Sequence, residues 1–163
     1  MYRDHRGNVT VGVGILLPTA SSAMALPFRF RSSGLLAPAD AITSEYDVVA
    51  GLPYEIDYGA GYYKPFTQLD LSDAAIEVLK RQHVNEDFER LIKIFPNFGK
   101  FPESAQLALL DMMYNLGSFQ EFPNLQRFVL EEDWVGAANE SERGGPSPER
   151  NAYVFDLFMD AAK

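Results

Sequence analysis

The first fourteen residues constrain the fold most, because their pattern predicts a β-hairpin. Apolar and small or polar residues alternate after the glycine at position 7, in the order Val9, Thr10, Val11, Gly12, Val13 and Gly14. An alternation of period two places the valines on one face of a strand and Thr10 with the glycines on the other. If the turn is centred on Gly7, Asp4 and Thr10 are directly opposed, with Cβ atoms about 4.5–5.5 Å apart. A carboxylate and a hydroxyl so placed could hold one water between them.

The clearest helix pattern begins after Ser72, the expected N-cap, and ends at Pro96. Apolar residues recur at helical spacing at Ile76, Leu79, Val84, Phe88, Leu91, Ile92 and Phe95. The other face carries acid-before-base pairs four residues apart, namely Glu77 with Arg81, Glu86 with Arg90, and Glu89 with Lys93. This charged face is typical of a solvated helix surface.

The segment from Glu103 to Leu116 is apolar on nearly every side, which predicts a helix enclosed by other helices. Gly117 supplies its left-handed end. Further helices are expected at about 124–131, 133–141 and 148–162. Trp134 is expected to anchor the core, since small apolar residues follow it.

The first half of the chain after the hairpin predicts less regular structure. Residues 17–34 are interpreted as irregular, and Asp40 or Thr43 could cap a short helix through about Ala50. Residues 59–66 are interpreted as a loop whose tyrosines, Tyr62 among them, could stack on sugars. The whole predicts an α+β fold, with a small β-containing lobe at 1–70, a long connecting helix, a helical lobe at 71–163, and a ligand cleft between the lobes.

Composition narrows the function classes. The 163 residues suit a single domain, and no cysteine is present for a disulfide or a thiolate metal site. A formal net charge of −9 argues against nucleic acid as a partner. No signal peptide or run long enough to span a bilayer is visible, so membrane insertion is not expected. His5 and His83 have no ligand spacing, so a metal site is not expected.

Three blocks of the chain resemble the phage-type lysozymes and related muramidase domains of bacterial toxins and secreted antibacterial effectors. Tyr2, Asp4, Gly7, Thr10, Gly12 and Gly14 follow the family pattern Tyr-x-Asp-x-x-Gly-x-x-Thr-x-Gly-x-Gly. Residues 107–117 look like the family's central buried helix. Phe122-Pro123, residues 133–138 and residues 148–151 are similar to its C-terminal helices. The resemblance spans most of the chain, is loose over residues 21–64, and implies a lysozyme-like fold.

The resemblance implies a peptidoglycan hydrolase that needs no cofactor. It cleaves the β-1,4 bond between N-acetylmuramic acid and N-acetylglucosamine with inversion, and Asp4 and Thr10 hold the attacking water. Tyr114, Asn115 and Arg150 match positions that line the sugar-binding cleft. Each of these five residues also has a plainer interpretation. Asp4 could cap a turn and Thr10 could be an ordinary strand residue. Tyr114 could be a core aromatic, Asn115 a helix-end amide and Arg150 a surface charge.

Two departures from the family pattern bear on activity. The family's general acid is a Glu about nine residues before the aspartate, whereas here the chain begins three residues before Asp4. Either the sequence is part of a longer chain, or the domain has lost the acid; substitutes among the chain's own glutamates would be Glu45, Glu55, Glu121 or Glu140. Ile15 stands where the family usually has a histidine beside the cleft.

Two rival functions remain open: a non-catalytic glycan-binding or interaction module, and a chitinase-like activity on uncharged glycans. For the muramidase, the expected partners are peptidoglycan glycan strands and, if the domain is an effector, an immunity protein; the chain is expected to be monomeric. The acidic charge suits a domain delivered close to its substrate, that is, secreted or carried into the periplasm of a target bacterium.

Overall fold

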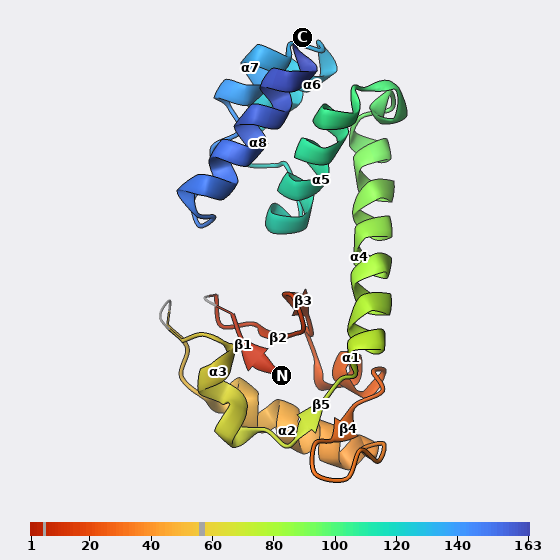
Figure 1. The fold of residues 1–163 in the computed structure, drawn as a ribbon. Helices are drawn as coiled ribbons and strands as arrows, with labels where there is room; N and C mark the ends of the chain where they lie inside the picture. Colours follow the sequence, from red (N-terminus) through yellow and green to blue (C-terminus); the bar gives the residue numbers. More distant parts are fainter. Residues whose placement is uncertain (5, 56–57) are drawn as a thin grey trace. The chain divides into compact units, whose positions relative to one another are not determined.

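A computed structural model describes residues 1–4, 6–55 and 58–163, and in it the chain divides into two units (Figure 1). Unit 1 comprises Met1–Arg81 and unit 2 comprises Gln82–Lys163. The division falls within helix α4 (Asp73–Ile94). Small antiparallel sheets lie in unit 1, and the helices of unit 2 contribute side chains to one hydrophobic core, which confirms the α+β class.

Unit 1 begins with a three-stranded antiparallel sheet in the order β1 (Tyr2–Arg3), β2 (Val9–Val11) and β3 (Ile15–Leu16). The hairpin turn between β1 and β2 includes Gly7, whose φ of 83° suits a residue without Cβ. Val9 and Val11 are buried, as expected for the core face.

The predicted strand is too long at its far end. Gly12 and Gly14 have φ values of 59° and 100°, so they form a second turn that brings β3 back onto β2. Val13 lies within this turn and is 52% exposed. The alternation therefore describes a strand only up to Val11, and the glycines after it serve turn geometry.

The remainder of unit 1 contains α1 (Ala20–Met24), β4 (Arg29–Phe30), α2 (Ala39–Gly51), α3 (Ala60–Tyr63), the 3₁₀ helix η1 (Lys64–Phe66) and β5 (Leu69–Asp70), which pairs with β4. The irregular interpretation of residues 17–34 is wrong at α1, where Thr19 forms a capping box with Ser22. The loop interpretation of 59–66 is also wrong, because these residues form α3 and η1. Helix α2 occurs where expected, but Pro38 occupies its N-cap position.

Unit 2 confirms the predicted helices closely. It contains the C-terminal part of α4, η2 (Phe98–Lys100), α5 (Glu103–Leu116), α6 (Pro123–Leu130), α7 (Trp134–Asn139) and α8 (Pro148–Ala161). The predicted cap at the start of α4, which lies in unit 1, is also present: the Ala75 backbone N–H donates to Ser72 Oγ at 3.2 Å. In unit 2, Gly117 ends α5 with a φ of 73°, as predicted. Capping residues located these ends because they satisfy backbone groups that a helix leaves unpaired.

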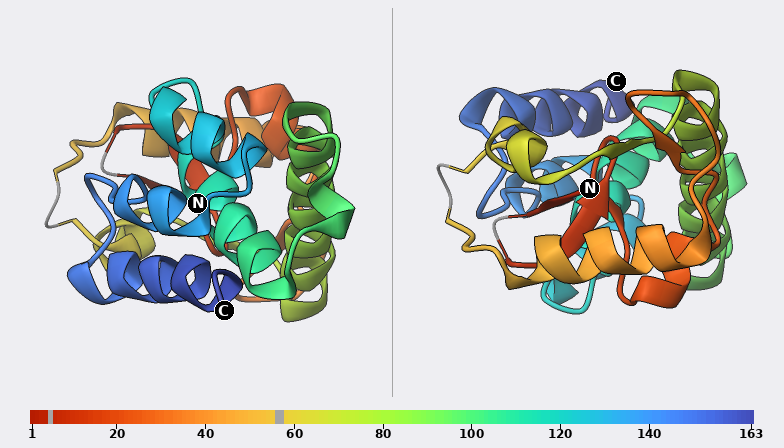
Figure 2. Two further views of the ribbon diagram at one scale, coloured as in Figure 1. Left: turned by 90° about the horizontal axis from the view of Figure 1, so that it is seen from above. Right: turned by 90° about the horizontal axis from the view of Figure 1, so that it is seen from below.

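The core of unit 2 is aromatic and helical. Helix α8 packs against α5 and α7 (Figure 2). Trp134 is buried, with its ring centroid 5.1 Å from that of Phe101 and 6.5 Å from that of Phe158, which confirms it as a core anchor. Burying a phenylalanine of this kind contributes about 1.5–3 kcal/mol.

The charged face of α4 carries ion pairs. Glu77 pairs with Arg81 at 3.4 Å as expected, while Arg90 contacts Asp87 at 3.3 Å, three residues before it. Within the described residues, none of the helices is both long and apolar enough to cross a membrane.

Candidate functional site

Asp4 closes the hairpin turn with its carboxylate. Oδ1 accepts from the backbone N–H groups of Arg6 at 2.9 Å and Asn8 at 2.8 Å, and Oδ2 accepts from Asn8 Nδ2 at 3.1 Å. A carboxylate offers about four acceptor positions, so the described residues leave one position on Oδ2 for a further donor. The carboxylate of this half-buried residue is thus held in one orientation by its own turn.

The expected opposition of Asp4 and Thr10 is wrong. The strand register pairs Thr10 with Tyr2, and the Asp4 backbone N–H donates to the Asn8 carbonyl at 2.9 Å. The turn is therefore centred on residue 6, one residue before Gly7. The reason is the Asp4 carboxylate, whose bonds to the N–H groups of Arg6 and Asn8 tighten the turn around residue 6. Thr10 is 2% exposed, and its hydroxyl donates to the Tyr2 carbonyl at 3.2 Å.

The turn that carries Asp4 is braced from one side. A Cβ built on Gly7 would lie 2.6 Å from the Tyr54 ring, so only glycine fits this position without a shift. Arg3 lies over the same ring at 4.3 Å, and it donates to the carbonyls of Gly7 at 2.8 Å and Leu52 at 2.6 Å. The close approach of these groups fixes the turn.

Tyr62 lies in a group of aromatic rings in unit 1. Its ring stacks on Tyr58 with centroids 4.1 Å apart and planes 4° apart, and it meets Tyr63 edge-on at 5.1 Å. Tyr63 is buried, and its hydroxyl donates to the Pro53 carbonyl at 3.0 Å. One face of Tyr62 is therefore covered by Tyr58, and the Phe66 ring also lies close to it, with centroids 5.9 Å apart.

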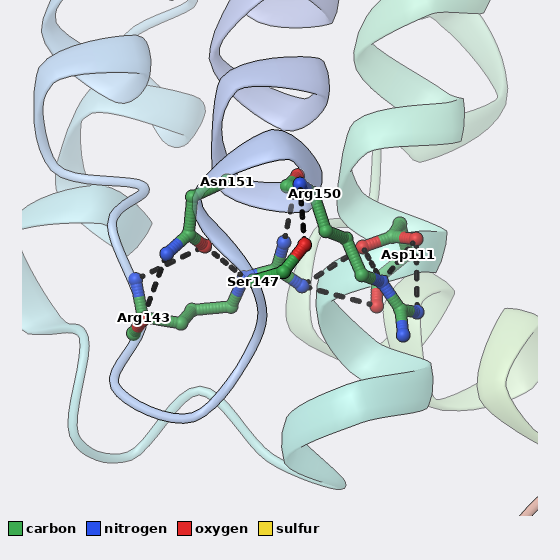
Figure 3. Close-up of polar contacts among 5 residues, drawn as sticks. All are labelled: Asp111, Arg143, Ser147, Arg150 and Asn151. Carbon is green, nitrogen blue, oxygen red and sulfur yellow. Dashed lines mark hydrogen bonds and ion pairs between the residues drawn. The ribbon is translucent and has the colours of Figure 1, made fainter.

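In unit 2, Asp111 on α5 binds two arginines (Figure 3). Arg143 Nη1 donates to Oδ1 at 2.8 Å; Arg150, in the first turn of α8, donates from Nη2 to Oδ2 at 3.0 Å and from Nε to both oxygens at 3.1–3.2 Å. This two-nitrogen contact is the bidentate geometry that makes arginine–carboxylate pairs strong. Of the expected substrate-binding residues, Arg150 is the one that the structure places in an ion-pair network.

Arg143 is the buried member of this cluster, with none of its side chain exposed. Its Nε donates to Asn151 Oδ1 at 3.2 Å, and Asn151 Nδ2 donates back to the Arg143 carbonyl at 2.9 Å. The sequence reasoning missed both Asp111 and Arg143. The available signal was Asp111 itself, the one charged residue between Ser104 and Leu116, since a charge on a buried helix requires a partner.

The other two expected substrate-binding residues lie near the end of α5. Tyr114 is half-buried and meets the His83 ring edge-on, with centroids 5.2 Å apart, whereas Asn115 is exposed. Tyr114 therefore combines a packing contact with partial exposure.

The glutamates considered as substitute acids have different surroundings. Glu45 is 8% exposed, and its Oε2 accepts from the backbone N–H groups of Gln68 at 2.6 Å and Leu69 at 2.9 Å, which gives it a structural role beside β5. Glu55 is exposed. Glu121 and Glu140 line a surface hollow of about 450 Å³ in unit 2.

Asp87 is a buried carboxylate that the sequence reasoning did not single out. It is 1% exposed on α4, and its Oδ2 has no hydrogen-bond partner among the described residues. Burial raises its pKa, while His83 at 3.7 Å and Arg90 at 3.3 Å oppose that shift. The pair with His83 is charged on both sides only when the imidazole is protonated.

In the part of the chain that the structure describes, no group of three or more His, Cys, Asp and Glu side chains is arranged to hold a metal ion. His5 lies outside the described residues.

Comparison of the chain with protein-family models, curated proteins and solved structures found no match. The resemblance to phage-type lysozymes therefore stands on the three blocks of residues named above, and the function it implies is a proposal.

Proposed function

We propose that the chain is a lysozyme-like muramidase domain that cleaves the β-1,4 bond between N-acetylmuramic acid and N-acetylglucosamine with inversion. The observation that carries the proposal is the fixed orientation of the Asp4 carboxylate: within the described residues, three hydrogen bonds orient it and leave one acceptor position on Oδ2. In an inverting glycosidase, one carboxylate must orient a water toward the sugar, and a fixed orientation raises the fraction of productive geometries.

The register assigns the two hairpin residues different parts in this proposal. Asp4 orients the water, and Thr10 is a positioning residue, because its hydroxyl ties β2 to the Tyr2 carbonyl two residues before Asp4. The resemblance implies that the general acid is a glutamate about nine residues before the aspartate. Arg150, Tyr114, Asn115 and Tyr62 contact the glycan.

A non-catalytic glycan-binding module is the second candidate, and one observation favours it. The buried Thr10 hydroxyl is bonded to the hairpin's own backbone, whereas the resemblance assigns it to the attacking water. A module of this kind would retain the binding residues and need no general acid.

The proposal also states where the domain acts, namely outside the producing cell. Walls rich in anionic polymers favour basic enzymes, and this chain has a formal net charge of −9. A domain delivered near its substrate by a carrier, as a secreted antibacterial effector, does not depend on long-range attraction. An immunity protein in the producing cell is the partner that such a toxin requires.

The test begins with the coding sequence upstream of Met1 and continues with the full product of that reading frame. We expect a glutamate about nine residues before Asp4, clearing of a peptidoglycan gel by the full product, and loss of clearing in Asp4→Ala. Asp40→Ala, which removes an exposed carboxylate in the first turn of α2, is the matched control and should clear normally. Equal clearing by Asp4→Ala would refute the role of Asp4; binding to the gel without any clearing would favour the module.

A further inference from the structure

The cluster around Asp111 holds two positive charges and one negative charge. Arg143 and Arg150 both pair with Asp111, at 2.8 Å and 3.0 Å, which leaves a formal charge of +1 in a chain whose net charge is −9. A positive excess kept at one point of an acidic protein suits an anionic ligand.

The excess charge is presented by Arg150. Arg143 has no exposed side-chain surface and Asp111 is 20% exposed, while Arg150 is 40% exposed. Within the described part of the chain, Arg150 uses Nε and Nη2 on Asp111, and Nη1 has no partner. One guanidinium nitrogen therefore remains free for a ligand on the solvent side of the cluster.

The fold has already ordered this side chain. Arg150 donates to the Asp111 carboxylate from two nitrogens. Arg143 donates to the same carboxylate, and its own guanidinium is oriented by a hydrogen bond to Asn151. An arginine loses up to about 2 kcal/mol of rotamer entropy when it is immobilised, and here that cost falls on folding and not on binding. Hydrogen bonds from the Ser147 side chain and from its own backbone lower the pKa of the neighbouring Glu149, which is exposed and makes no ion pair with Arg150 among the described residues.

We propose that Arg150, positioned by Asp111 and Arg143, binds a carboxylate of the substrate. In peptidoglycan this is a carboxylate of the peptide stems attached to muramic acid. The inference rests on the proposed function and narrows its substrate class to acidic glycans, which separates it from an activity on uncharged chitin. A carboxylate suits the site because a charge-assisted N–H···O⁻ bond to a pre-oriented guanidinium is stronger than a neutral one.

The test measures binding to ¹⁵N-labelled protein by NMR titration at low salt, with three probes. These are a peptidoglycan tetrasaccharide with intact stem peptides, the same fragment with its stem carboxylates converted to neutral amides, and chitotetraose. We expect the intact fragment to bind about tenfold more tightly than the amidated one, and the Arg150 Nε–H resonance to shift only with the intact fragment. Arg150→Ala and Arg150→Lys should both abolish most of this preference. Lysine keeps the positive charge but cannot donate from two nitrogens in the planar geometry of a guanidinium.

Arg127→Ala is the matched control, because Arg127 is a 54%-exposed arginine of the same unit that pairs with Glu131 at 3.0 Å. It should keep the tenfold preference. Equal affinity for intact and amidated fragments, or an undiminished preference in Arg150→Ala, would overturn the inference and leave the muramidase proposal standing. No binding of any probe by the wild-type chain would overturn both.

Discussion

Asp4 and Asp111 are two hydrogen-bonded aspartates, one in each unit, and their carboxylates have different kinds of partners. Backbone N–H groups and the Asn8 amide hold Asp4, and all these donors are neutral. Two guanidinium groups hold Asp111. Neutral donors orient a carboxylate without cancelling its charge, whereas the arginines cancel the charge of Asp111 and exceed it. This difference agrees with the proposed roles, in which Asp4 orients the water and Arg150 of the cluster around Asp111 binds the substrate.

The two units also differ in what stabilises them. The core of unit 2 is formed by helices and by phenylalanines such as Phe95, Phe98 and Phe158, all fully buried. Unit 1 has strands of two or three residues, and its core collects side chains from separate short elements around Phe28, Tyr63 and Leu69. Each unit nevertheless has a contiguous core of its own.

The largest expected effects test this division into two cores. Phe28→Ala and Phe158→Ala each remove a ring that is at most 1% exposed, so each should lower the free energy of unfolding of its own unit by about 4 kcal/mol. Hydrogen exchange should show faster exchange in unit 1 for the first variant and in unit 2 for the second. Equal acceleration across both units for either variant would show that the two cores act as one.

The second prediction concerns the arginines of the Asp111 cluster. Arg143→Ala leaves Asp111 with one partner and opens a cavity, so it should destabilise unit 2 by about 3 kcal/mol in urea unfolding. Arg150→Ala removes a 40%-exposed side chain and should cost less than about 1 kcal/mol. If the order of the two variants is reversed, Arg150 serves stability more than binding.

The third prediction addresses the turn that carries Asp4. Gly7→Ala combines a φ of 83° with a Cβ 2.6 Å from the Tyr54 ring, while Gly14→Ala has a φ of 100° and open space around it. We expect a loss of about 2 kcal/mol for Gly7→Ala and about 1 kcal/mol for Gly14→Ala in thermal unfolding. Equal losses would mean that Tyr54 does not brace the turn.

The smallest expected effect depends on pH and comes from Asp87. Burial raises its pKa in the folded state, so the stability linked to its protonation is present below its ordinary pKa and is lost as the pH rises through the raised value. Asp87→Asn should therefore stabilise unit 2 by about 1 kcal/mol at about pH 7 and have little effect near pH 3. The charges of His83 and Arg90 lower the pKa of the same carboxyl, and that of Glu86 raises it. All three residues stay unchanged in this test. A destabilised Asp87→Asn at neutral pH would contradict the assignment.

Local signals predicted the helices of unit 2 well. Ser72, Gly117 and the apolar run from Glu103 to Leu116 act through capping and burial, which depend on residues close in sequence. The small elements of unit 1 were harder, because α1 and α3 span five and four residues, too few to show a periodicity.

The candidate site was predictable in its residues and not in its geometry. The sequence singled out Asp4 and Arg150, but the hairpin register depended on which backbone N–H groups the Asp4 carboxylate would accept from. The partners of Asp111 lie 32 and 39 residues away along the chain. Contacts at such separations leave no local pattern, so Arg143 resembled an ordinary residue of a glycine-rich turn.

Mass spectrometry of muropeptides tests the central claim most directly. Purified peptidoglycan is digested with the full product of the reading frame, reduced with borohydride, and its fragments are identified. The account predicts fragments ending in reduced muramic acid, released by the wild-type protein and by Asp40→Ala but not by Asp4→Ala. Fragments that end in reduced glucosamine, or muramic ends released equally by Asp4→Ala, would contradict it.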